Sequence, residues 1–182
     1  APIAYNQQLM TEREVVVGAD GFRLPGTLTL PLSASADKKV PCVVLVHGSG
    51  PNDRDETLGP NKPFRDLAWL LAEEGIATLR YDKRTKVYGA RYIPEGRESD
   101  YDVEAVDDAV AIVEQVAAYP EVDAERIYLL GHSLGGTLAP RVAQRSGRLA
   151  GVILLAGAAR PLEDLLIEQV EYINSLSPSK EA

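Results

Sequence analysis

Apolar positions along this chain fall into short blocks that alternate between the spacing of strands and the spacing of helices. Short apolar or alternating runs, typical of strands, occupy residues 14–17, 23–30, 42–46, 76–79, 127–130 and 152–155. Helical spacing of apolar residues occupies residues 64–74, 101–119, 134–146 and 161–176. The helix over 101–119 carries the clearest apolar stripe, formed by Val103, Val106, Val110, Val113 and Ala117.

The order of these blocks predicts an α/β fold. A glycine-containing turn at 18–21 joins the first two strands into an antiparallel hairpin. Strands and helices alternate after it, which is typical of a mostly parallel sheet with helices on both faces. Two polar stretches, 48–61 and 82–99, are predicted to be loops. A chain of 182 residues has the length of one domain.

Composition narrows the range of partners. The net charge of −8 argues against a nucleic-acid partner, because phosphate binding needs clustered Lys and Arg. No apolar run approaches the ~20 residues of a membrane span. The single cysteine, Cys42, lies in an apolar run and is predicted to be a small buried side chain. We expect a cytoplasmic location, with export left open, and an upstream segment removed before Ala1.

Ser133 is the candidate nucleophile. It lies in Gly131-His132-Ser133-Leu134-Gly135, between an apolar strand and a helix rich in small residues. Gly-x-Ser-x-Gly in that setting indicates a nucleophile elbow, a strained turn that presents the serine above a sheet. The alternative is a glycine-rich turn that only allows strand and helix to pack closely.

A second glycine-rich loop, His47-Gly48-Ser49-Gly50-Pro51, follows the strand 42–46. Acyl transfer places negative charge on a carbonyl oxygen, and backbone N–H groups aimed at that oxygen stabilise it. The N–H of Leu134, after the nucleophile, and the N–H of Ser49 are the predicted oxyanion donors, with Gly50 as the second choice for the latter. The alternative is a plain loop.

Three sequence strings, His47–Glu56, Arg80–Arg84 and Gly131–Gly136, resemble bacterial carboxylesterase-like serine hydrolases of the α/β-hydrolase superfamily. The resemblance extends from about Val15 to Leu176. It implies a small-molecule ester substrate, an acyl-enzyme on Ser133, and no metal or cofactor. Members of the superfamily have eight strands, whereas we count six here. Residues 1–182 are therefore predicted to be an incomplete α/β-hydrolase domain without strands seven and eight, with 161–182 beginning a lid or cap.

The general base is not evident from the sequence. His132 is the neighbour of Ser133 in the tight turn, and His47 lies in the other loop. In some members of the superfamily the acid follows strand six, but residues 156–159 contain no carboxylate. We therefore expect the base and the acid to come from a further segment or a partner chain, which would also complete the sheet. By itself the 182-residue chain is predicted to be inactive.

Other polar residues have less specific roles. We interpret Asp53, Arg54, Asp55 and Glu56 as a mutually paired cluster that orders its loop, with contact to the substrate as the alternative. Asp82, Lys83 and Arg84 are interpreted as structural, pinning the loop beyond their strand. Tyr88, Tyr92 and Tyr101 either line an acyl pocket or cover the edge of the core. Two functional alternatives remain: a non-catalytic α/β-hydrolase-like binding module, and a peptidase or acyl-CoA thioesterase that shares the elbow.

Overall fold

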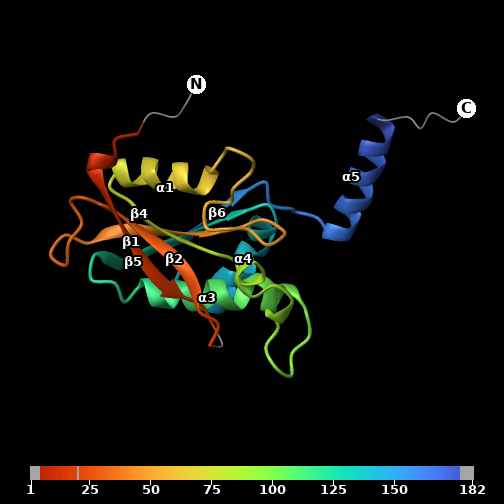
Figure 1. The fold of residues 1–182 in the computed structure, drawn as a ribbon, viewed down its shortest axis with the longest axis horizontal. Coiled ribbons are helices and arrows are strands. Elements are labelled where there is room, and N and C mark those ends of the chain that lie inside the picture. The colour runs from red at the N-terminus through yellow and green to blue at the C-terminus, as the bar shows by residue number, and fades with distance from the viewer. Residues whose placement is uncertain (1–4, 20, 177–182) are drawn as a thin grey trace, which may run out of the picture.

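The computed structural model describes residues 5–19 and 21–176, which form a mixed sheet flanked by helices (Figure 1). The strands are β1 (Met10–Val17), β2 (Leu24–Pro31), β3 (Val40–Val46), β4 (Ala77–Tyr81), β5 (Val122–His132) and β6 (Gly151–Leu155). The helices are α1 (Pro63–Glu73), α2 (Arg84–Tyr88), α3 (Asp107–Val116), α4 (Leu134–Ser146) and α5 (Leu162–Leu176).

The sheet has the strand order β1-β2-β4-β3-β5-β6. The pairs β1–β2 and β2–β4 are antiparallel, and the pairs β4–β3, β3–β5 and β5–β6 are parallel. Helix α1 covers one face of the sheet, and α3 and α4 cover the other (Figure 1). The predicted hairpin, parallel sheet and two helical layers are therefore confirmed.

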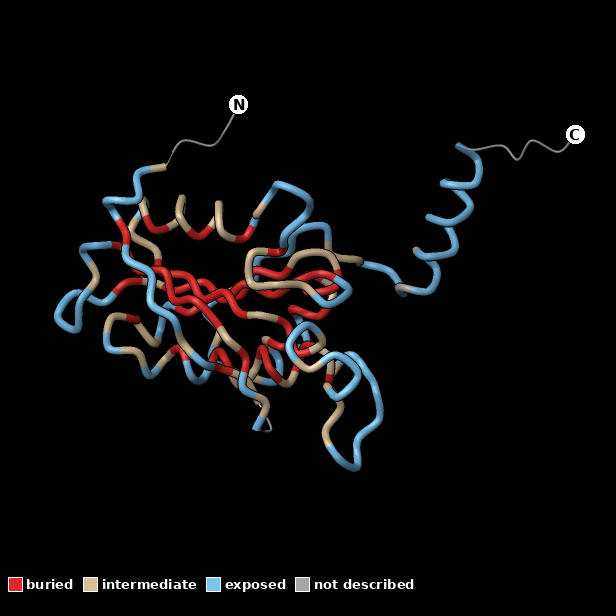
Figure 2. Tube along the Cα trace, viewed as in Figure 1, coloured by how far each residue is buried: buried red, intermediate tan, exposed pale blue. Residues whose placement is uncertain are grey.

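Apolar side chains fill the space on both faces of the sheet (Figure 2). On the α1 face, Phe64 packs with Val43, Leu45 and Leu130. On the other face, α3 and α4 pack against the buried residues of the central strands, and Cys42 is fully buried there. Because β3 is buried on both faces, it is apolar almost throughout, as expected for a central parallel strand.

The predicted loop over 82–99 is partly wrong. Residues 84–88 form α2, a short helix with no apolar stripe that a pattern could detect. Strands β1 and β5 also begin earlier than predicted, because their first residues are largely polar and give no apolar run. The helix predicted over 101–119 is α3 preceded by a π-helical turn at Asp102–Val106.

The C-terminal elements are exposed. Strand β6 lies at the edge of the sheet, and its side chains from Val152 to Leu155 are 37–50% exposed. Helix α5 stands away from the rest of the molecule, and its described residues are exposed along nearly its whole length (Figures 1 and 2). Of the helices in the described ranges, none has the length and apolar character needed to cross a membrane.

Candidate active site

Ser133 lies at the sharp turn between β5 and α4. Its backbone has φ 53° and ψ −115°, a conformation that is costly for a residue with a side chain. Hydrogen bonds hold the turn on both sides: Ser133 N–H donates to the carbonyl of Leu155 (2.8 Å), and the N–H of Thr137 donates to Ser133 O (3.0 Å). Such over-determination by the surrounding structure is what allows a strained serine to persist.

Close backbone packing explains the two glycines of the motif. A Cβ atom on Gly131 would lie 2.2 Å from the carbonyl oxygen of Gly135. A Cβ atom on Gly135 would lie 2.4 Å from the carbonyl oxygen of Val46, at the end of β3. Both distances are far inside van der Waals contact, so the turn requires glycine at both positions. These contacts bring the start of α4 directly against the loop that follows β3.

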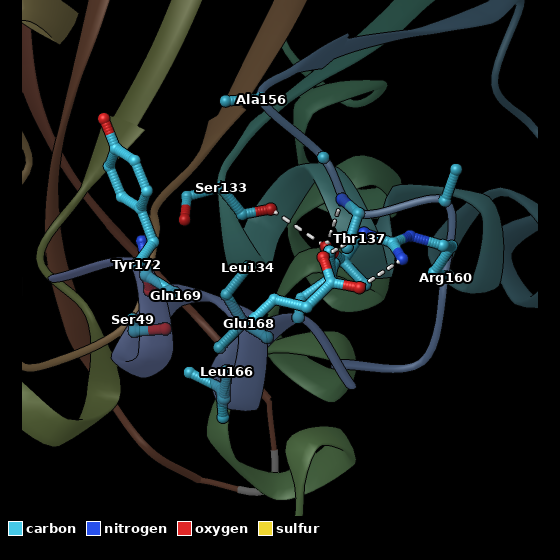
Figure 3. Close-up of a pocket in the computed structure, with 14 residues that line it drawn as sticks. Ser49, Ser133, Leu134, Thr137, Ala156, Arg160, Leu166, Glu168, Gln169 and Tyr172 are labelled. Carbon is cyan, nitrogen blue, oxygen red and sulfur yellow. Dashed lines mark hydrogen bonds and ion pairs between the residues drawn. The ribbon is translucent and has the colours of Figure 1, made fainter. Parts of the chain in front are cut away.

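That loop also approaches Ser133. A Cβ atom placed on Gly48 would lie 3.2 Å from the Cβ atom of Ser133. Ser49 and Leu134 line the same pocket as Ser133 (Figure 3). Neither the N–H of Ser49 nor the N–H of Leu134 donates a hydrogen bond to any other residue that the structure describes. The two residues predicted to supply the oxyanion donors thus line one pocket, and neither N–H is bound by the described residues.

Glu56 is a buried carboxylate beside this turn, and its contacts with Gly48 and His132 were not predicted from the sequence. Its side chain accepts hydrogen bonds from Gly48 N–H (2.7 Å) and from Nδ1 of His132 (2.9 Å). Its φ of 51° shows that the backbone is strained to place it there. Glu56 therefore ties the loop after β3 to the elbow of Ser133.

The other charged residues of the 48–61 loop hold it against the sheet. Arg54 pairs with Asp82 beyond β4 (3.2 Å) and with Glu14 on β1 (2.7 Å). Asp55 pairs with Arg80 on β4 and with Lys62. The cluster orders its loop as predicted, but the expected mutual pairing is wrong, because the ion-pair partners of Arg54 and Asp55 lie outside it.

Neither histidine contacts the hydroxyl of Ser133. Among the described residues, the Ser133 Oγ atom has no hydrogen-bond partner. His132 points to Glu56 instead. His47 is 1% exposed and packs against the rings of Phe64 and Tyr81. Burial, with a contribution from the charge of Lys83, lowers the pKa of His47 to about 4. The imidazole is therefore neutral at pH 7, and we assign it to the core.

A pocket of about 620 Å³ opens above Ser133 (Figure 3). Its floor comes from the elbow and from the Ala156–Ala159 turn after β6, and α5 forms its far wall. Tyr172 on α5 faces Ser133 and Ser49 across the pocket, while Arg160 and Glu168 form an ion pair at 2.7 Å (Figure 3). The wall residues of α5 were not singled out in the sequence, because an amphipathic helix does not reveal which surface it will face.

The three tyrosines considered for an acyl pocket do not line this one. Tyr88 packs edge-on against Phe22 and hydrogen-bonds the backbone of Arg23, so it covers the edge of the core. Tyr92 hydrogen-bonds Ser99 and lines a separate pocket. Tyr101 is 44% exposed.

Comparison with known proteins gives a consistent picture. The family model described as "Alpha/beta hydrolase family" matches residues 43–178. Esterase EstD of Thermotoga maritima is 42% identical over 165 residues, which are 91% of this chain and 37% of that esterase. The chain thus spans little more than a third of the length of the curated relative that it matches.

Solved structures share the fold. An acetyl xylan esterase from Paenibacillus sp. R4 superimposes with a TM-score of 0.63 at 25% identity, over 83% of this chain and 50% of that one. A hypothetical protein from Pseudomonas aeruginosa superimposes with a TM-score of 0.65 at 20% identity, over 97% of this chain and 57% of that one. With a family model matching most of its length, the chain belongs to the alpha/beta hydrolase family.

Proposed function

We propose that this chain carries the nucleophile and the oxyanion donors of a serine hydrolase that cleaves carboxylic esters. The observation that carries the proposal is the strained Ser133, whose free hydroxyl faces a pocket shared with Ser49 and Leu134. Similarity to an esterase from Thermotoga maritima and to an acetyl xylan esterase favours an ester as the substrate class. Short-to-medium acyl groups are the proposed range.

In the proposed reaction, Ser133 Oγ attacks the ester carbonyl carbon as a general base takes the hydroxyl proton. The carbonyl oxygen becomes an oxyanion that accepts hydrogen bonds from the N–H groups of Ser49 and Leu134. Collapse of this intermediate breaks the carbon–oxygen bond of the ester, and the base returns the proton to the leaving alcohol. Water then attacks the acyl-enzyme through the same steps and releases the acid.

We propose that the base and its acid are supplied from outside these 182 residues. Support comes from the two histidines, since one is buried in the core and the other is bound to Glu56. A further segment or a partner chain would bring them to the Ser133 side of the pocket and add strands beside β6. We also propose that α5 begins a lid, because it stands off the body and walls the pocket.

The replacement Ser133→Ala tests the proposal. In the full-length protein it should lower kcat on p-nitrophenyl esters by about 10⁴-fold or more, because the proposed acyl-enzyme forms on the Ser133 hydroxyl. The replacement Ser146→Ala, at the opposite end of α4, is the matched control and should leave kcat unchanged.

Intact-mass spectrometry with a fluorophosphonate probe gives a second measurement. One adduct on the full-length protein, lost in Ser133→Ala, is expected, whereas the 182-residue chain alone should remain unlabelled. Turnover that survives Ser133→Ala would contradict the assignment. A preference for aminoacyl amides or acyl-CoA over esters would point to a peptidase or a thioesterase, and a folded full-length protein without any labelling would indicate a binding module.

A further inference from the structure

Lys83 is a buried cation that reaches the loop beside the nucleophile. Its side chain is 2% exposed, and its Nζ atom donates a hydrogen bond to the carbonyl oxygen of Gly48 (3.0 Å). The same ammonium group pairs with Glu104, from the turn that leads into α3. Lys83 thus donates a hydrogen bond to the backbone carbonyl of Gly48, a residue 35 positions away in the sequence. Gly48 itself lies next to Ser133.

Gly48 is held at both of its backbone polar groups. Its N–H donates to the Glu56 carboxylate at 2.7 Å. Its carbonyl accepts from Lys83 and also from the side-chain amide of Asn52 (3.0 Å). Asn52 is itself fixed, because its carbonyl accepts the N–H of Lys83 (3.0 Å). An anion, a cation and an amide therefore leave the Gly48 backbone little freedom to rotate.

Fixing the Gly48 carbonyl also fixes the Ser49 N–H. The two groups belong to one peptide unit, which is planar and trans, so they point in opposite directions. With the carbonyl directed at Lys83, the N–H is directed away from it, and Ser49 lines the pocket that contains Ser133. A hydrogen bond from a cation to a carbonyl also polarises the peptide and strengthens the N–H on its other side, more so where water is excluded.

We propose that Lys83 is a positioning residue for ester hydrolysis, which aims and polarises the Ser49 N–H through the carbonyl of Gly48. The proposal rests on the proposed function and adds to it a group that never touches the substrate. A different role is also open to a buried lysine, namely an ion pair with Glu104 that only pins the turn after β4. The two roles make different predictions for the two partners of the ammonium group.

Steady-state kinetics of the full-length protein on p-nitrophenyl butyrate separate these roles. Lys83→Met keeps the length of the side chain but removes the donor, and should lower kcat about 10- to 100-fold, because a misdirected oxyanion donor loses part of its effect. KM should change by less than about threefold, since the donor acts mainly in the transition state. Glu104→Gln, which leaves Lys83 free to bind Gly48, should keep kcat within about threefold of the wild type.

Lys62→Met is the matched control. It also removes a lysine–carboxylate pair from the same loop, with Asp55, but it does not touch Gly48, so kcat should stay within about threefold. An unchanged kcat in folded Lys83→Met, or an equal loss in Glu104→Gln, would overturn the proposal. Where Lys83→Met fails to fold, Asn52→Ala removes the other donor to the same carbonyl and should lower kcat about 3- to 10-fold, whereas an unchanged kcat would refute the role of that carbonyl.

The amide ¹⁵N chemical shift of Ser49 reports on the hydrogen bond between Lys83 and the Gly48 carbonyl independently of activity, since this shift responds to hydrogen bonds at the preceding carbonyl. The chemical shift should change in Lys83→Met and remain unchanged in Lys62→Met. Should the wild-type protein fail to hydrolyse any ester, the proposed function falls, and this shift still decides whether Lys83 sets the Gly48–Ser49 peptide. No movement in Lys83→Met would overturn the inference whatever the activity.

Discussion

His47 is a neutral imidazole in the core, and its burial has a consequence for stability. Burial lowers its pKa in the folded protein to about 4, from 6.5 when exposed. Between these two pH values the unfolded chain binds the proton more tightly, so protonation favours unfolding. The stability associated with neutral His47 is therefore fully present above about pH 6.5 and is lost as the pH falls toward 4.

The replacement His47→Gln measures this effect. Between pH 7 and pH 5, the loss in free energy of unfolding should be smaller in the variant than in the wild type by about 2 kcal/mol. Urea unfolding at the two pH values, followed by circular dichroism, gives both numbers. Equal losses in the two proteins would mean that His47 takes up its proton in the folded state without penalty.

At the level of single residues, the sequence predicted that Ser133, Ser49 and Leu134 come together, but not which side chains hold the Ser49 loop in place. The Gly-x-Ser-x-Gly motif and the loop after β3 each carry a local signal, because glycines are needed where backbones touch. Glu56 and Lys83 carry no such signal. Their contacts with Gly48 depend on the path of two loops and on the approach of β4 to β3, which only the folded chain defines.

The packing of α4 against β3 depends on a position without a side chain. A Cβ atom on Gly135 would lie 2.4 Å from the oxygen of Val46 and 2.6 Å from that of His47. Neither backbone can yield easily, since β3 lies between two other strands. Gly135→Ala should therefore lower the free energy of unfolding by about 1–3 kcal/mol or more.

Urea unfolding of a second variant provides the comparison. In Gly151→Ala, at the start of β6, the added methyl group would meet only ring carbons of Tyr128, the nearest at 3.3 Å. A tyrosine ring can shift where a central strand cannot, so this variant should remain within about 1 kcal/mol of the wild type. Equal stability of the two variants would show that α4 can move away from β3 without cost.

At the level of elements, apolar spacing was sufficient for the order of strands and helices. It did not predict that β4 lies between β2 and β3, because the order of strands within a sheet does not affect the spacing of apolar residues along the chain. The short helix α2 was missed for a related reason: four of its five residues are polar or aromatic, and its buried Arg84 reads as a surface residue in sequence. In the structure Arg84 is paired with Asp108 of α3 (2.7 Å).

At the scale of the whole molecule, strand β6 leaves an exposed apolar edge on the sheet. Its residues from Val152 to Leu155 are apolar and 37–50% exposed. An apolar edge strand can pair with another chain. The 182-residue chain should therefore associate with rising concentration, which sedimentation velocity would detect.

Leu154→Lys should weaken that association, because a charge on an edge strand opposes pairing. Val16→Lys, on β1 at the opposite edge, is the control and should leave it unchanged, since that edge already carries charged residues. A chain that stays monomeric at all concentrations would show that the β6 edge is not a pairing surface.

The strand order also bears on how the chain is made. Strand β3 pairs with β4 on one side and with β5 on the other, yet β5 begins about 75 residues after β3 ends. At synthesis rates of about 5–20 residues per second, the ribosome needs roughly 4–15 seconds to deliver that partner. During this interval β3, which is apolar almost throughout, lacks its β5 partner, and pairings so distant in sequence form slowly. Each copy of the nascent chain is thus exposed to chaperones and to misassembly well before Ser133 is translated.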